Sequence, residues 1–268
     1  MYARSSGSLI AVVLCSVALA GVSGRAHAQP APPPKPPDAM PQQRPPVPTP
    51  QPPPGPPPTK PTEPVEKLGD NLFRIGAIRV DTAKKEVSVP GVVNDVSVLE
   101  FVANTKGGFK AYESALELDT NAINFNLALI LIGLDKEHST ASKFHFDPSP
   151  PKGDPVEIWV EWDDGGKTRR VRAEQLVYNE MSKQTLTEGP WVYTGSVFIE
   201  SAGYLADMDG VLIGFVHTPA PIIESPRPLG EGGYGANRLN PSIGLKPGTR
   251  VTLVVRALER GKDKAKPR

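Results

Sequence analysis

The chain has 268 residues, and its 30 Lys and Arg nearly balance its 29 Asp and Glu. This balance indicates neither a nucleic-acid partner nor binding to an anionic membrane surface. The single cysteine, Cys15, lies in an N-terminal apolar run. If that run is removed, the remaining chain has no thiol, which excludes disulfides, thiolate catalysis and iron–sulfur clusters. We predict no cofactor.

Residues 1–28 have the pattern of a signal peptide. Arg4 precedes an apolar run over residues 9–22, and Ala26-His27-Ala28 has the small-x-small pattern that a signal peptidase cuts after. The run is shorter than the roughly 20 residues that span a bilayer. We therefore expect export to the periplasm, the cell envelope or the extracellular space, with no membrane span after cleavage. An uncleaved anchor is the alternative.

Residues 29–64 are predicted to be a disordered, proline-rich linker. Between Pro30 and Pro64, 19 of 35 residues are proline, and each proline ring fixes φ and removes a backbone donor. This composition favours a polyproline II spacer, which at about 3.1 Å per residue could extend on the order of 100 Å. Two more specific alternatives are that this segment is a ligand for a docking protein or a spacer that crosses a cell wall.

Residues 65–259 are expected to form one domain of mainly β structure. Alternation over residues 156–162, followed by the turn sequence Asp163-Asp164-Gly165-Gly166, predicts a hairpin with residues 168–173. Residues 226–248 are predicted to form a long surface loop, and residues 260–268 a disordered basic tail. Segments rich in β-branched residues predict further strands over residues 72–80, 86–93, 97–103, 110–118, 191–200, 211–218 and 249–258.

One helix is predicted near residues 121–132. Asn121 can cap its first turn, and Gly133 is placed to end it. Apolar residues occupy nearly all sides of this segment, which is typical of a helix packed into a core. The fold class that follows is mainly β (α+β): an antiparallel β sandwich, or an open, barrel-like meander, with one buried helix.

Two groups of residues suggest binding sites. His138, His145 and Asp147 offer two imidazoles and a carboxylate that could ligate a metal, although their spacing fits neither a zincin helix nor a zinc finger. Surface histidines are the alternative. Tyr234 and Arg238 follow a glycine-rich stretch that could close over a ligand, whereas the alternative is a loop that only connects strands.

Several segments of the chain resemble the YdjY-like family of bacterial envelope proteins. The likeness covers about residues 70 to 258 in the same order and implies an exported domain whose biochemical function is unassigned. The segments that carry it are Leu99-Glu100-Phe101, Lys110-Ala111-Tyr112-Glu113-Ser114, Leu129 to Gly133, Trp191 to Ser196, Tyr204 to Asp207 and Pro247 to Val251.

The resemblance also implies candidate site residues and some losses. Many relatives have histidine where this chain has Tyr112, a cysteine near Asn104 and a histidine near Asn126, so a metal or redox site there would lack its softest ligands in this chain. A ferredoxin-like label cannot apply to a mature chain without cysteine. The residues that match the family and could share a site are Lys110, Glu113, Ser114, Gly195, Ser196 and Asp207. Of these, Ser196 and Asp207 join Tyr234 and Arg238 as the four residues predicted to bind a ligand.

The alternative is that these residues have a structural role, as a buried Lys–Glu pair and as hydroxyls that form hydrogen bonds to backbone groups in turns. We therefore expect an exported, non-catalytic envelope domain that acts through binding or structure, with an envelope protein or cell-wall component as its partner. A hydrolase or ligand-processing enzyme that uses Lys110, Glu113 and Ser114 is one alternative. A metal-binding module at His138, His145 and Asp147 is another.

Overall fold

The computed structural model describes residues 63–201, 203–227 and 233–260. The predicted leader, most of the predicted linker, the glycine-rich stretch at 228–232 and residues 261–268 lie outside this part. Within it, 17 strands and two α-helices confirm the prediction of a mainly β fold. The α-helices are α1 (Ala122–Leu131) and α2 (Leu205–Asp209).

The strands fall into one large sheet and two small ones. The large sheet contains β1 (Val65–Lys67), β2 (Leu72–Ile75), β3 (Ile78–Asp81), β4 (Glu86–Val93), β5 (Phe101–Thr105), β6 (Ser114–Leu118), β7 (Asp154–Asp163), β8 (Thr168–Arg172), β11 (Trp191–Tyr193), β14 (Val211–Gly214), β15 (Ile223–Glu224) and β17 (Arg250–Ala257). The small sheets are β9 (Val177–Asn179), β10 (Gln184–Thr185) and β16 (Asn237–Leu239), and the pair β12 (Phe198–Ile199) and β13 (Gly203–Tyr204).

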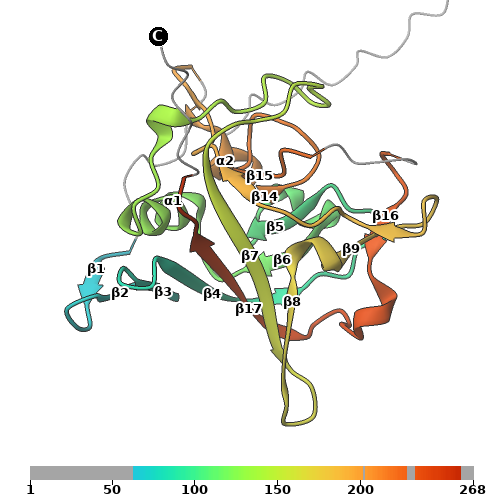
Figure 1. The fold of residues 1–268 in the computed structure, drawn as a ribbon, viewed down its shortest axis with the longest axis horizontal. Coiled ribbons are helices and arrows are strands. Elements are labelled where there is room, and N and C mark those ends of the chain that lie inside the picture. Colours follow the sequence, from blue (N-terminus) through green and yellow to red (C-terminus); the bar gives the residue numbers. More distant parts are fainter. Residues whose placement is uncertain (1–62, 202, 228–232, 261–268) are drawn as a thin grey trace, which may run out of the picture. The chain divides into compact units, whose positions relative to one another are not determined.

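Eight strands of the large sheet close into a barrel. Their order is β4-β17-β7-β11-β15-β14-β5-β6, and β6 pairs back onto β4. The pairs β5–β6 and β14–β15 are parallel, and the other neighbours are antiparallel, so the barrel is mixed. Figure 1 shows β7 and β17 side by side at the front, with β5 and β6 behind them. The structure is thus a closed barrel. The predicted sandwich is not confirmed, and the alternative, an open, barrel-like meander, differs from the structure in that the barrel is closed.

Closure of the barrel depends on a close approach at Gly91. This residue pairs with Val251 of β17 on one side and with Leu118 of β6 on the other. A Cβ atom at position 91 would lie 2.4 Å from the carbonyl oxygen of Glu117 and 2.8 Å from Leu118 Cδ2. Only glycine therefore lets β4 join both neighbours at this point.

Gly91→Ala is expected to lower the free energy of unfolding by about 1–3 kcal/mol, because the added methyl group overpacks the β4–β6 junction. Urea denaturation followed by tryptophan fluorescence measures this change. Gly69→Ala is the matched control, since its Cβ would have its nearest neighbour at 3.8 Å. Equal stability of the two variants would contradict the role assigned to Gly91.

The barrel interior is filled by alternating apolar side chains. Val156, Ile158, Val160 and Trp162 of β7 are buried, as their alternation predicted. Helix α1 confirms the prediction of one helix near 121–132, and Phe125 and Leu129 bury its inner side. Ile130, however, is 49% exposed, so this apolar helix is buried on one side only.

Some predicted strands are shorter than expected because local turns interrupt them. Gly76, with φ +57°, divides the predicted strand 72–80 into the hairpin β2–β3. Residues Phe109–Glu113 form the short 3-10 helix η1, so the strand predicted from 110 begins only at Ser114. Gly195 and Ser196, both with positive φ, end β11 at Tyr193. None of the helices in the described residues is long and apolar enough to cross a membrane.

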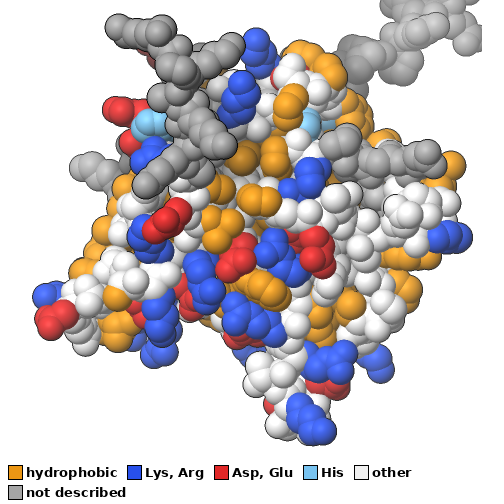
Figure 2. All heavy atoms as spheres, in the orientation of Figure 1, with side chains coloured by type: hydrophobic (Ala, Val, Ile, Leu, Met, Phe, Trp, Pro, Cys, Tyr) orange, Lys and Arg blue, Asp and Glu red, His pale blue; other side chains and the backbone are white. Residues whose placement is uncertain are grey.

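The outer face of β4, β17, β7 and β8 carries interleaved charges. Arg172 pairs with Glu157 at 3.1 Å, and Arg256 pairs with Glu86 at 2.8 Å and with Glu157 at 3.4 Å. Figure 2 shows this mixture of basic and acidic side chains across the front of the barrel. Both of these arginines therefore have an acidic partner on the same face.

Candidate functional site

Polar residues from separate segments meet beside η1. Glu100 precedes β5, and Glu113 precedes β6; because these strands are parallel neighbours, the backbone N–H of Glu100 donates to the carbonyl of Glu113 at 2.9 Å. His145 comes from the loop before β7, and Tyr234 from the loop before β16. We call Glu100, Lys110, Glu113, His145 and Tyr234 the Glu100 site.

Glu100 is the centre of this site. It is only 3% exposed, and His145 Nε2 lies 3.2 Å from its Oε2 atom. The hydroxyl of Tyr234 also bonds to the Glu100 carboxylate, and this bond raises the pKa of Tyr234. A nearly buried carboxylate is therefore held by a histidine and a tyrosine, and no Lys or Arg pairs with it in the described part of the chain.

Lys110 and Glu113 form an ion pair next to Glu100. Lys110 Nζ lies 2.6 Å from Glu113 Oε1 and donates to the Tyr112 hydroxyl at 3.2 Å. Burial lowers the pKa of Lys110, but its bonds to Glu113 and Tyr112 outweigh burial and raise that pKa above its ordinary value. The ammonium is thus fixed in its charged form, which does not suit a general base. The sequence predicted this pair, as a catalytic candidate or as structure.

Exposed aromatic rings border the Glu100 site. Phe109 is 71% exposed, Tyr112 58%, Tyr234 56% and Phe146 47%. The rings of Phe109 and Tyr112 lie 6.0 Å apart, and those of Phe146 and Tyr234 lie 5.2 Å apart, both edge to face. Phe146 also stacks on His145 at 3.9 Å. Such a concentration of exposed aromatic surface is typical of binding surfaces.

The two predicted serines lie outside the Glu100 site. Ser114 is fully buried, and its hydroxyl donates to the carbonyl of Lys110 at 2.8 Å. Ser196 is also fully buried; its hydroxyl donates to the carbonyl of Ala220 at 2.6 Å and accepts from the N–H of Ala206 at 3.2 Å. Both hydroxyls are therefore engaged by backbone groups, which is typical of a structural role.

Two other predicted ligand-binding residues also have structural partners. A side-chain oxygen of Asp207 accepts from the N–H of Ala122, at the start of α1, at 3.4 Å. Burial raises the pKa of Asp207, and this backbone bond opposes the shift. Arg238 pairs with Glu180 at 3.2 Å. Of the four residues predicted to bind a ligand, only Tyr234 belongs to the Glu100 site.

The predicted metal ligands do not come together. His138 contacts Arg260 at 3.0 Å, whereas His145 contacts Glu100. Asp147 accepts backbone N–H groups of Lys143 and Ser149, which lower the pKa of its carboxyl. Across the described ranges, no group of three or more His, Cys, Asp or Glu side chains is placed to hold a metal ion. Phe146 alone separates His145 from Asp147 in the sequence, and the two side chains point to different partners.

Glu100 and Phe146 were missed by the sequence analysis. Glu100 had two signals: it is a charged residue inside the apolar run Val98-Leu99-Glu100-Phe101-Val102, and it lies in a segment that resembles the YdjY-like family. Phe146 had no signal in the sequence. Its unusual feature is a backbone φ of +63°, which is rare for a non-glycine residue and which no sequence pattern discloses.

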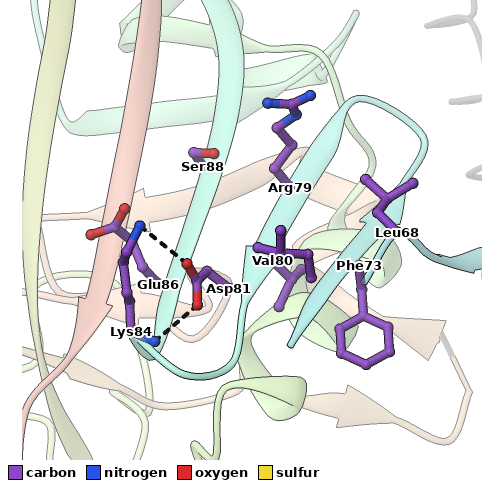
Figure 3. Close-up of a pocket in the computed structure, with 9 residues that line it drawn as sticks. Leu68, Phe73, Arg79, Val80, Asp81, Lys84, Glu86 and Ser88 are labelled. Atoms are coloured by element: carbon purple, nitrogen blue, oxygen red, sulfur yellow. Dashed lines mark hydrogen bonds and ion pairs between the residues drawn. The ribbon is translucent and has the colours of Figure 1, made fainter. Parts of the chain in front are cut away.

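A separate hollow lies on the strands that extend the sheet beyond the barrel. It measures about 250 Å³ and lies beside Leu68, Phe73, Arg79, Val80 and Asp81. Figure 3 shows Lys84 bound to Asp81, and Glu86 pairs with Arg256. None of the residues singled out in the sequence lines this hollow.

The fold and the site define a small, mixed β-barrel domain that presents aromatic and carboxylate groups on its connecting segments. The model of one family, the YdjY domain, matches residues 78–256. This match covers more than half of the chain, and the chain belongs to the YdjY domain family, as the resemblance implied. A comparison with curated proteins found no match, and neither did a comparison with solved structures.

Proposed function

We propose that this protein is an exported module of the cell envelope that binds another envelope protein through the Glu100 site and the aromatic rings around it. The observation that carries the proposal is the group of four exposed aromatic side chains beside a nearly buried carboxylate. Buried apolar area at the centre of an interface supplies most of its binding energy, and aromatic residues are enriched there. The leader pattern and the proline-rich segment support an exported domain on a spacer.

Binding is favoured over the hydrolase alternative by the state of the candidate nucleophile. A serine nucleophile needs an accessible hydroxyl and a base within hydrogen-bond reach. Ser114 is 0% exposed, and its hydroxyl is committed to the carbonyl of Lys110. Lys110 is itself held as an ammonium by Glu113. These contacts therefore favour a structural role for the Lys110–Glu113 ion pair and for the Ser114 hydroxyl.

Photo-crosslinking in the native envelope tests the proposal. A photoreactive phenylalanine replaces Phe109, which is 71% exposed. We expect a discrete crosslinked protein whose yield falls at least tenfold with the double change Phe146→Ala and Tyr234→Ala, because truncation of central aromatic residues typically costs 2 kcal/mol or more. Crosslinking to peptidoglycan instead of protein would assign the surface to the cell wall.

The matched control is Phe198→Ala, which removes an aromatic side chain that is 55% exposed on β12. This variant should leave the crosslinking yield unchanged. An equal loss with Phe198→Ala, or no loss with the double variant, would contradict a binding role for the Glu100 site. Circular dichroism of each purified variant checks that the barrel has folded.

Export is tested by intact-mass spectrometry of the protein from its envelope fraction. Cleavage after Ala28 gives a mature chain that starts at Gln29 and lacks Cys15, so it should not react with a maleimide. A mass that retains the Met1 region would indicate an anchored protein, and recovery in the cytoplasmic fraction would contradict export.

A further inference from the structure

We infer that the partner segment bound at the Glu100 site carries a lysine or arginine next to an apolar side chain. This inference rests on the proposed binding function and names the chemistry of the partner. The Glu100 carboxylate would receive the cation, and the rings of Phe146 and Tyr234 would contact the cation and its apolar neighbour.

The first support is the state of Glu100. Its side chain is 4% exposed, yet among the described residues it pairs only with His145, which carries a positive charge only when protonated. A buried carboxylate without a full counter-charge is costly unless it is well bonded. A cation from a partner segment that packs against the exposed rings of Phe146 and Tyr234 would supply this counter-charge.

The second support is that the protein binds one of its own cations in this manner. Lys110 Nζ pairs with Glu113 at 2.6 Å and lies 5.5 Å from the centre of the Tyr112 ring and 6.0 Å from that of Phe109. These distances are within the range of cation–π contacts. Glu100, with Phe146 and Tyr234, offers the same combination of one carboxylate and two aromatic rings, and no lysine of the described residues pairs with this carboxylate.

The third support is the charge around the aromatic rings. The pKa of Tyr234 is raised by its bond to Glu100 and by the charges of Glu100 and Glu113, which together outweigh the opposite effect of Lys110. Asp209 also lies within electrostatic reach of Lys110 and Glu113. The carboxylates of Glu100, Glu113 and Asp209 thus outnumber the ammonium of Lys110 around this site, and this balance complements a basic segment.

Two short peptides test the inference by calorimetry with the purified protein. The probes are N-acetyl-Phe-Arg-Phe-amide and N-acetyl-Phe-Gln-Phe-amide, which differ in the central charge. We expect the arginine peptide to bind about tenfold more tightly at low salt, and this advantage to shrink as salt screens the pair. Glu100→Gln should remove the advantage, whereas Asp70→Asn, which removes a fully exposed carboxylate, should keep it.

The outcomes separate this inference from the proposed function. If both peptides bind equally and Phe146→Ala with Tyr234→Ala abolishes binding, the surface binds partners but the inferred cation is wrong. If neither peptide binds while the envelope crosslink persists, the inference is also wrong and the function stands. Because both peptides are compared on the unaltered protein, the result does not depend on the folding of Glu100→Gln.

Discussion

Glu174→Gln is expected to lower the free energy of unfolding by about 3–5 kcal/mol, which is typical when one partner of a buried ion pair is removed. Glu174 is 0% exposed and accepts two hydrogen bonds from Arg172, at 2.9 and 3.3 Å, and one from the N–H of Gly189 at 3.1 Å. Arg227 Nη2 lies 3.6 Å from the same carboxylate. The amide would leave these guanidinium groups without this negative charge.

Arg227 makes the loss large. Its Nη1 atom donates to the carbonyl of Pro190, but Nε and Nη2 are buried and form no hydrogen bond among the described residues. Burial lowers the pKa of Arg227, and the charge of Glu174 opposes this shift. Without Glu174, a mostly buried cation would keep its cost of desolvation and lose the charge that offsets it.

Urea denaturation at neutral pH measures the effect, with Glu66→Gln as the control. Glu66 pairs with Arg74 at the surface, and both side chains are nearly half exposed. An exposed pair contributes at most about 1 kcal/mol. If Glu174→Gln cost no more than Glu66→Gln, the carboxylate would not be the anchor of its arginines.

The strands whose signal is local were predictable from the sequence. The hairpin of β7 and β8 follows from the alternation of Val156, Ile158, Val160 and Trp162 and from the turn after Asp163, because side chains on a strand alternate between its faces. Helix α1 was also predictable because its signal is local. Asn121 accepts from the N–H of Asn124 at 2.7 Å and caps the first turn.

Closure of the barrel could not be predicted from local pattern. It depends on the contact of Gly91 with Leu118 and on two parallel pairings, β5 with β6 and β14 with β15. A parallel pair needs a crossover between its strands, and the one between β5 and β6 is η1, which the sequence analysis interpreted as the start of a strand.

The candidate site was likewise predictable only where its residues lie close together in the sequence. Lys110, Glu113 and Tyr234 were named from the sequence, and so was His145, as a candidate metal ligand. Lys110 and Glu113 are neighbours because they lie three residues apart in η1. Glu100 joins them only because β5 and β6 are parallel, and Phe146 only because its loop folds back onto His217. These placements are long-range, and short motifs do not contain them.

The segment that carries His145 and Phe146 is bound to the barrel through the buried carboxyl group of Glu224. Glu224 in β15 is 0% exposed, and Ser142 donates to it through its hydroxyl at 2.6 Å and its N–H at 3.4 Å. His217 adds a second anchor, because its ring nitrogens lie 2.8 Å from the carbonyl of Asp147 and 2.9 Å from that of Ser225. The aromatic edge of the Glu100 site therefore depends on these contacts.

Glu224 should make the stability of the protein fall as pH rises from about 4.5 to 7. Burial raises the pKa of Glu224 to about 7, although its bonds to Ser142 and the charge of His217 oppose this shift. Between these pH values the unfolded chain has lost the proton and the folded chain keeps it, so the free energy of unfolding decreases by about 1.4 kcal/mol per pH unit. The decrease in the free energy of unfolding sums to about 3 kcal/mol, and Glu224 causes no further decrease well above pH 7.

Comparison of Glu224→Gln with the unaltered protein isolates this effect from other titrating groups. The glutamine stays neutral, so its stability relative to the original should increase by about 3 kcal/mol between pH 4.5 and pH 8. Urea denaturation at each pH measures the difference. A difference that is constant with pH, or that decreases, would show that Glu224 is ionised in the folded protein at low pH.

Ser142→Ala provides a second, opposite test of the same carboxyl group. The serine hydroxyl donates to Glu224 and so favours its ionised form. Without this bond, the pKa of Glu224 should rise further, and the decrease in stability should extend to higher pH.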